Sequence, residues 1–106
     1  DPNKMGFQAE IFAAQQLAAD RLSEELAEKL DHQGVDLVKG NNFYQVKWLG
    51  KNFSLKEGTI GSLRKGLKTA QRARKRFFLI LICGDRPKDL FVKQTLEITP
   101  ELLNSL

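Results

Sequence analysis

The first thirty residues carry apolar positions at the spacing of a helix. Between Met5 and about Leu30, apolar residues recur every three or four positions, and charged residues lie between them. This pattern predicts one long amphipathic helix, because residues at that spacing share a face. Glu10 lies three residues after Phe7 and four before Ala14, so we expect it at the border of the buried face. The predicted buried stripe consists of Phe7, Ile11, Ala14, Ala18, Leu22, Leu26 and Leu30.

The pattern then changes to the alternation of β-strands. Two short apolar runs flank the turn-forming stretch 39–42, which predicts a hairpin. A loop of two residues (Gly40 and Asn41) or of all four gives the same register and sets Asp36 opposite Gln45. Alternation along the second strand places Lys47 on the face of Gln45, whereas an odd-length loop would break this alignment. The predicted strands are Val35–Val38 and Phe43–Leu49.

The second half of the chain predicts a helix, two strands and a short closing helix. The first of these helices runs from about Thr59 or Ser62 to Lys75, with its apolar residues inward and its basic residues outward. The run from Phe77 to Ile82 is apolar throughout, as in a central strand that is buried on both faces. The other predicted elements are a loop or short strand within Lys51–Gly61, around Phe53 to Leu55, a turn at Gly84–Asp89, a strand at Leu90–Leu96 and a helix opened by Thr99 and Pro100.

Length and composition agree with one folded domain. A chain of 106 residues with 42% hydrophobic residues can bury one modest core. The element order predicts a single three-layer α/β domain over residues 1–106, with a central mixed sheet flanked by helices. No apolar run approaches the roughly 20 residues that cross a bilayer, so we expect no membrane partner. The single Cys83 excludes an internal disulfide and is expected to be buried, and the single His32 is expected at a helix end or the surface.

Charge is distributed unevenly along the chain. The net charge is +4, and the stretch 64–76 carries seven basic residues and no acidic one. This asymmetry indicates a polyanionic partner such as nucleic acid, although a solvated basic helix face is an alternative explanation. Arg74 and Arg76 are at the positions where cations complement a helix C-terminus. The candidates for phosphate contacts, which fall near one helix face, are Arg64, Lys68, Arg72 and Lys75.

The predicted hairpin and first helix place several polar side chains close together. An aspartate that faces a carboxamide and a lysine, with Glu10 arriving from a helix edge, could bind a hard cation such as Mg²⁺ or Mn²⁺ through oxygen ligands. Such an ion polarises a phosphoryl oxygen and activates a bound water, and the lysine offsets the developing charge. These groups therefore suit phosphodiester hydrolysis. Tyr44 and Trp48 point to the other face of the strand, and we expect them to pack rather than to stack on bases.

The order of these residues resembles the PD-(D/E)XK, or restriction endonuclease-like, nuclease superfamily. That pattern has an acidic residue in the first helix, an aspartate on one strand and Glu-x-Lys or Gln-x-Lys on the next, followed by a helix and a hydrophobic strand. The similarity covers roughly residues 6–96 and implies a metal-dependent endonuclease. It also implies individual roles: Glu10 as a helix-borne metal-shell carboxylate, Asp36 as the central metal ligand, Gln45 in the usual glutamate position, Val46 as a ligand through its carbonyl, and Lys47 as the motif lysine.

Two groups within this superfamily are most similar to the chain. The hairpin resembles Mrr-type restriction enzymes and archaeal Holliday-junction resolvases, which cut DNA. The stretch Ser62 to Arg76, with Gln71 before a hydrophobic strand, resembles the toxin nucleases of bacterial contact-dependent inhibition systems, many of which cut tRNA. The resemblance implies action in the cytoplasm on DNA or tRNA, with DNA favoured. A homodimer, delivery within a larger secreted protein and an acidic immunity protein as partner remain open.

Each candidate residue also has a purely structural explanation. Asp36 could be a hairpin-end residue, Gln45 a hydrogen-bonded core amide, Lys47 a strand-edge charge and Glu10 part of a solvated helix start. Gln45 in particular replaces a carboxylate with a neutral carbonyl, which weakens a metal shell. The two rival functions are therefore a non-catalytic nucleic-acid-binding module of the same fold and an interaction domain whose basic helix binds an acidic protein.

Overall fold

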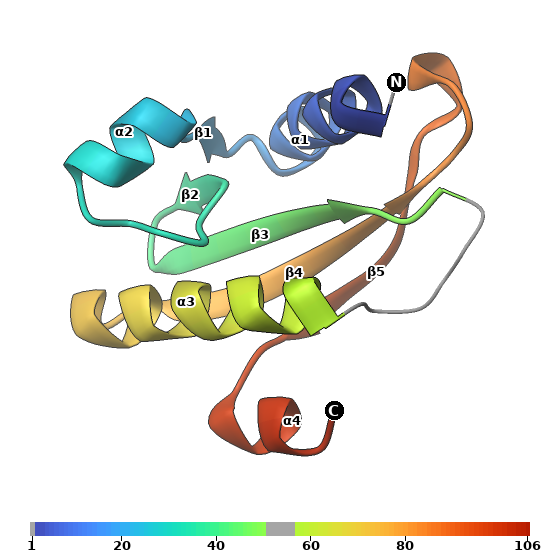
Figure 1. Cartoon of the computed structure of the whole chain (residues 1–106). Coiled ribbons are helices and arrows are strands. Elements are labelled where there is room, and N and C mark those ends of the chain that lie inside the picture. Colours follow the sequence, from blue (N-terminus) through green and yellow to red (C-terminus); the bar gives the residue numbers. More distant parts are fainter. Residues whose placement is uncertain (1, 51–56) are drawn as a thin grey trace.

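The computed structural model describes residues 2–50 and 57–106, and a five-stranded sheet runs through its middle (Figure 1). The strand order is β1-β2-β3-β4-β5. Strands β3 and β4 are parallel, and every other neighbouring pair is antiparallel, so the sheet is mixed as predicted. The strands are β1 (Asp20–Arg21), β2 (Leu37–Lys39), β3 (Asn42–Trp48), β4 (Arg76–Cys83) and β5 (Phe91–Glu97).

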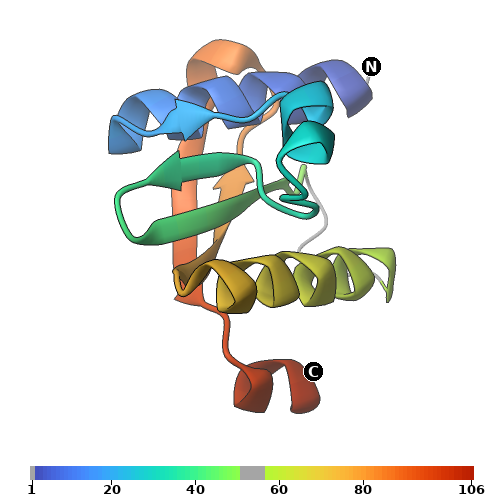
Figure 2. The ribbon, with the colours of Figure 1, turned by 90° about the vertical axis from the view of Figure 1, so that its left-hand side faces the viewer.

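Helices cover both faces of this sheet and complete the predicted three layers. Helix α1 (Pro2–Leu17) lies over one face, and α3 (Glu57–Ala73) lies over the other, with α4 (Pro100–Asn104) beyond α3 (Figure 2). Ala9 and Ala13 of α1 are completely buried against the first face. Leu63 and Ala70 of α3 are completely buried against the second. The central strand β4 contributes to both cores, which confirms that it is buried from two sides.

The hairpin has the predicted register. Its loop is the two-residue Gly40-Asn41, with φ of +56° at Gly40. Pairing of Leu37 with Tyr44 and of Lys39 with Asn42 places Asp36, one residue before β2, next in line opposite Gln45. Residues on the two faces of β3 also separate as predicted. Tyr44 packs in the α1 core and stacks on Phe78 at 5.4 Å.

The prediction of one long first helix is wrong. Helix α1 ends at Leu17, and Ala18 takes φ of +52°, which a helix cannot contain. The chain then forms β1, and Ser23 opens the short helix α2 (Glu24–Lys29) by accepting a hydrogen bond from the Leu26 N–H at 3.1 Å. The predicted stripe is also out of phase, because Phe7, Leu26 and Leu30 are 47%, 40% and 48% exposed.

The remaining elements follow the predictions closely. Helix α3 begins at Glu57 and ends at Ala73, β5 lies one residue later than expected, and the Thr99 hydroxyl caps α4 by accepting from Leu102. Cys83 is buried and free, and His32 follows α2 at a helix end. The strand expected around Phe53 to Leu55 lies outside the described residues. No helix in the described ranges has the length and apolar character that crossing a bilayer requires.

Candidate active site

An open groove of about 1210 Å³ lies between α1, β1 and α2 on one side and α3 on the other. Its floor is the part of β3 that extends beyond the end of β2. All five residues that the sequence assigned to chemistry line this one groove: Glu10, Asp36, Gln45, Val46 and Lys47. These residues come from three separate segments of the chain, and Glu10 is 26 positions before Asp36 in the sequence. The fold therefore brings distant residues together in one groove.

Asp36 is held in place by hydrogen bonds on both its backbone and its side chain. Its N–H donates to the Tyr44 carbonyl at 2.8 Å, and its Oδ2 accepts from the Val46 N–H at 2.8 Å. Oδ1 remains for a ligand. Burial raises the pKa of Asp36 to about 6, although the Val46 N–H and the charge of Arg21 lower it. A buried carboxyl with a raised pKa in a groove is a marker of functional sites.

The Val46 carbonyl faces the same side as the Asp36 side chain. Within one residue of a strand, the N–H and C=O point to the same edge, and the N–H of Val46 points at Asp36. Because β2 begins only at Leu37, this carbonyl lies beyond the end of the paired β2–β3 segment. Its oxygen is therefore outside the β2–β3 ladder and can serve as a donor, and the metal-ligand role that the resemblance implies stays a prediction.

Glu10 approaches the same place from α1. Its side chain is 25% exposed, and its Oε1 lies 3.7 Å from the Nε of Arg21. Burial and the nearby charge of Asp36 raise the pKa of Glu10 to about 7, and Arg21 offsets only part of this effect. Because burial raises the pKa of both carboxyls and the charge of Asp36 adds to the shift at Glu10, a cation bound between them would stabilise both ionised forms. The predicted border position of Glu10 is confirmed.

Gln45 is a hydrogen-bonded core amide, as its structural explanation predicted, and it also lines the groove. It is 8% exposed, and its Nε2 donates to the Gly34 carbonyl at 3.0 Å. Because a carbonyl only accepts, this bond fixes the amide with nitrogen toward Gly34 and leaves Oε1 for a ligand. Gly34 has φ of +80°, and a Cβ there would lie 2.5 Å from the backbone N of Gly66 in α3. The amide is thus anchored to a loop that is pressed directly against the helix.

Lys47 and α3 supply positive charge to the groove. Lys47 lies on the β3 face that it shares with Gln45 and is half-buried. Lys65 lines the groove from α3, together with Thr59 and Ser62. Over residues 4–50 and 58–106, no ion pair involves either lysine. Their charges are therefore available to an anionic ligand.

The four predicted phosphate contacts do not line this groove. Arg64 and Lys68 border a smaller cavity of about 280 Å³ that α3 forms with α4. Arg72 lies 3.4 Å from the Asp31 carboxylate, and the Nζ of Lys75 donates to Asn41 at 3.2 Å. The sequence identified the basic helix but not the side of it that faces the site, which carries Lys65.

Three further predictions for individual side chains can be compared with the structure. Arg76 does not cap α3, because it lies in β4 and forms a two-bond ion pair with Glu97 at 2.8 and 2.9 Å. Arg74 follows α3 directly, with φ of +57°. Trp48 is a packing residue as predicted: it packs against the core, and its indole N–H donates to the Gly84 carbonyl at 2.8 Å.

Arg21 and Glu24 also line the groove. The sequence pattern did not indicate them, because it placed both residues in one continuous helix.

The donors in the groove fit a hard divalent cation. Glu10, the free oxygen of Asp36, the Gln45 Oε1 and the Val46 carbonyl are all oxygen ligands, which suit Mg²⁺ or Mn²⁺ rather than a softer metal. The set contains only two carboxylates, and no group of three or more His, Cys, Asp or Glu side chains gathers in the part of the chain that the structure describes. We therefore expect modest metal affinity that increases as the two carboxyls lose their protons.

No protein-family model, curated protein or solved structure matches this chain. Inference about function therefore depends on the groove itself: its donors, its charges and their positions.

Proposed function

We propose that this protein is a Mg²⁺- or Mn²⁺-dependent endonuclease of the PD-(D/E)XK type that hydrolyses phosphodiester bonds in nucleic acid. One observation carries the proposal. Two carboxyls with raised pKa values, Glu10 and Asp36, lie in one groove with the Gln45 amide, the Val46 carbonyl and Lys47, which forms no ion pair within residues 4–50 and 58–106. A metal-assisted hydrolase needs this combination of oxygen ligands and one free cation.

The residues of the groove divide the chemistry between them. Glu10, Asp36, Gln45 and Val46 would hold the ion, which supplies Lewis-acid polarisation of a phosphoryl oxygen and a more acidic bound water. Lys47 has no anionic partner among the described residues and would orient the attacking water and stabilise negative charge on the phosphoryl group. Lys65 on the opposite wall would bind a neighbouring phosphate.

The substrate is a nucleic acid, with DNA favoured and tRNA as the alternative. The net charge of +4 favours a polyanion. Arg21, Lys47 and Lys65 line the groove beside four acidic residues, Glu10, Glu24, Glu28 and Asp36, whose negative charge a bound metal ion would offset. The resemblance to toxin nucleases and resolvases supports a cytoplasmic site of action, with an acidic immunity protein and a homodimer as candidate partners. Linear duplex DNA, branched DNA and total tRNA are the substrates that separate these cases.

The test is cleavage by the purified chain with Mg²⁺, with Mn²⁺ and with EDTA. We expect one of the three substrates to be cut with metal and left intact in EDTA. Asp36→Asn keeps an oxygen that can accept from the Val46 N–H but removes the charge, and Lys47→Met keeps the apolar stem. Each should lose activity by a factor on the order of 10² or more. Lys88→Gln removes the same positive charge as Lys47→Met but lies outside the groove, so it is the control for that variant. Full activity in both site variants would exclude this site.

A non-catalytic nucleic-acid-binding module is the second candidate, and Gln45 favours it. The neutral amide is buried and already bonded to Gly34, and it leaves the metal shell with two carboxylates. This alternative predicts salt-dependent binding without cleavage under any metal. An interaction domain for an acidic protein instead predicts that neither duplex, branched DNA nor tRNA binds.

A further inference from the structure

Arg21 brings another cation into the groove, from an element that the sequence pattern did not predict. It lies in β1, where it pairs with Leu37 of β2 at the edge of the sheet. Its guanidinium carbon lies 4.7 Å from the centroid of the Phe7 ring, and its Nε lies 3.7 Å from Glu10. The side chain is therefore fixed between a ring and a carboxylate at the mouth of the proposed site.

One N–H donor of Arg21 has no acceptor in the part of the chain that the structure describes. It is the buried Nε, whose distance of 3.7 Å from Glu10 exceeds that of a hydrogen bond. The Phe7 ring offers no strong acceptor. A guanidinium carries five N–H donors in a rigid fork that matches two oxygens of one anion. A buried donor without a partner costs free energy. The side chain is still 32% exposed and lines the groove, so a small shift of the guanidinium toward an incoming oxyanion would give that donor an acceptor.

We propose that Arg21 binds a non-bridging phosphate oxygen of the substrate backbone, next to the phosphate held by the metal ligands. The inference rests on the proposed function and adds a substrate contact to it. Lys65 lies on the α3 wall and Arg21 on the β1 wall, so the two would hold the backbone from opposite sides of the groove. Phosphate is favoured over a protein carboxylate because Lys47 and Lys65 line the same groove, and a polyanion can engage all three cations together once a metal ion offsets the acidic residues beside them.

A purely structural role for Arg21 makes a different prediction. If Arg21 only neutralises Glu10 and Asp36, its loss should alter the pKa values and the stability of the fold. It should not alter how many counterions the nucleic acid releases on binding. The dependence of affinity on salt concentration counts phosphate contacts, so it separates the two roles without any need for cleavage.

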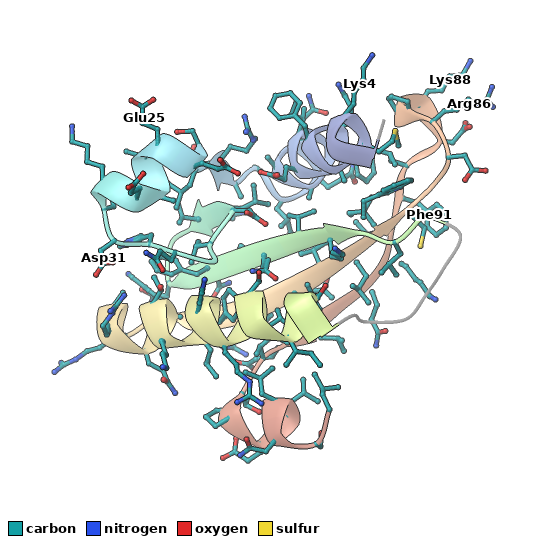
Figure 3. The ribbon with its side chains drawn as sticks, viewed as in Figure 1. Lys4, Glu25, Asp31, Arg86, Lys88 and Phe91 are labelled. Carbon is teal, nitrogen blue, oxygen red and sulfur yellow. The ribbon has the colours of Figure 1, made fainter. Side chains whose placement is uncertain are left out.

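The experiment measures binding of a fluorescein-labelled DNA duplex to the full chain, with Ca²⁺ in place of Mg²⁺ and again in EDTA, by anisotropy over a series of salt concentrations. Arg21→Gln should reduce the slope of log K against log salt by about 0.9, the value for one phosphate on B-DNA. Arg21→Lys should keep the slope and bind more weakly, because an ammonium cannot make the forked contact. Lys88→Gln carries the same charge change at η1 (Pro87–Asp89), which lies far from α2 in Figure 3, and should leave the slope unchanged.

Circular dichroism of each variant verifies that it is folded, and Arg21→Lys tests the site if Arg21→Gln does not fold. The proposal is overturned if folded Arg21→Gln keeps the wild-type slope, or if Lys88→Gln loses as much slope as Arg21→Gln. Wild-type binding without cleavage, combined with a reduced slope in Arg21→Gln, would support the Arg21 contact and remove only the catalytic part of the proposed function. A wild-type chain that binds neither duplex DNA, branched DNA nor tRNA, with Ca²⁺ or in EDTA, would overturn both.

Discussion

Two groups of residues in the groove are held in different ways. We call Asp36, Gln45, Val46 and Lys47, on the floor and beside it, the hairpin wall, and Glu10 and Arg21, on the side opposite α3, the charged wall. In the hairpin wall, Asp36 and Gln45 each have a backbone hydrogen-bond partner at 3.0 Å or less. In the charged wall, the two side chains meet each other at 3.7 Å, and the Arg21 Nε has no hydrogen bond.

The side chains of the hairpin wall are therefore fixed by hydrogen bonds, whereas those of the charged wall depend on electrostatic attraction. The hairpin wall is fixed by the sheet and by the contact of Gly34 with α3, so it has its shape before any ligand arrives. The charged wall is held mainly by electrostatic attraction, which responds to pH and to bound ions. We therefore expect substitution of Glu10 to change stability over a higher pH range than substitution of Asp36, and substitutions beneath the hairpin wall to change stability at every pH.

The largest expected effect concerns the charged wall and pH. The pKa of Glu10 is about 7 in the folded protein, above the ordinary value of 4.5, so the native state holds the proton more tightly than the unfolded state. The free energy of unfolding should therefore fall as pH rises from about 4.5 to 7, with the loss complete above pH 7. The shift corresponds to up to about 3 kcal/mol. Glu10→Gln cannot ionise and should be more stable than wild type at pH 8 and similar to it at pH 4.

Urea unfolding at pH 4, 6 and 8 measures this difference. Asp36→Asn is the matched variant in the hairpin wall, and its gain should appear over a lower window, because the pKa of Asp36 is about 6 against an ordinary 3.8. Equal stability of Glu10→Gln and wild type at pH 8 would mean that Glu10 is not desolvated, and the distinction between the two walls would fail.

The next effect concerns the support beneath the hairpin wall. A Cβ at Gly66 would lie 2.2 Å from the Phe77 ring and 2.8 Å from the Gly34 carbonyl, which is the acceptor for Gln45. Gly66→Ala should lower the free energy of unfolding by about 2 kcal/mol, because overpacking outweighs the helix propensity of alanine. It should also displace Gly34 and so disturb the Gln45 amide.

Gly61→Ala is the control for this change, since it lies in the same helix and a Cβ there would meet nothing within 4 Å. Alanine at that position should raise stability slightly through helix propensity alone. A Gly66→Ala variant as stable as Gly61→Ala would show that α3 does not press on the loop.

The two walls also differ in how far the sequence could predict them. The hairpin wall follows from local rules: an even loop fixes the register, and alternation assigns Gln45 and Lys47 to one face. The charged wall depends on a helix that ends at Leu17 although the apolar spacing continues beyond it. The signal that was overlooked is Ser23 followed by Glu24 and Glu25, a cap with acidic residues in the first turn of a new helix.

Other features of the site could not be predicted from spacing at all. The contact between Gly34 and Gly66 joins residues 32 positions apart, and only the packed structure explains why both lack a side chain. The side of α3 that faces the groove depends on how the helix rotates over the sheet. For that reason the basic stretch was recognised while Lys65, the residue in it that reaches the groove, was not distinguished from its neighbours.

The smallest expected effect tests that distinction directly. Lys65 and Lys68 are three positions apart on α3, and they line the groove and the cavity with α4 respectively. Lys65→Gln should weaken nucleic-acid binding by roughly 1 kcal/mol, about fivefold, as expected for the loss of one phosphate contact. Lys68→Gln removes the same charge and should change the affinity less than twofold, because it lies outside the groove. Anisotropy titrations of both variants at one salt concentration make the comparison. If Lys68→Gln has the larger effect, the phosphate backbone follows the outer face of α3, and the groove is not where the nucleic acid binds.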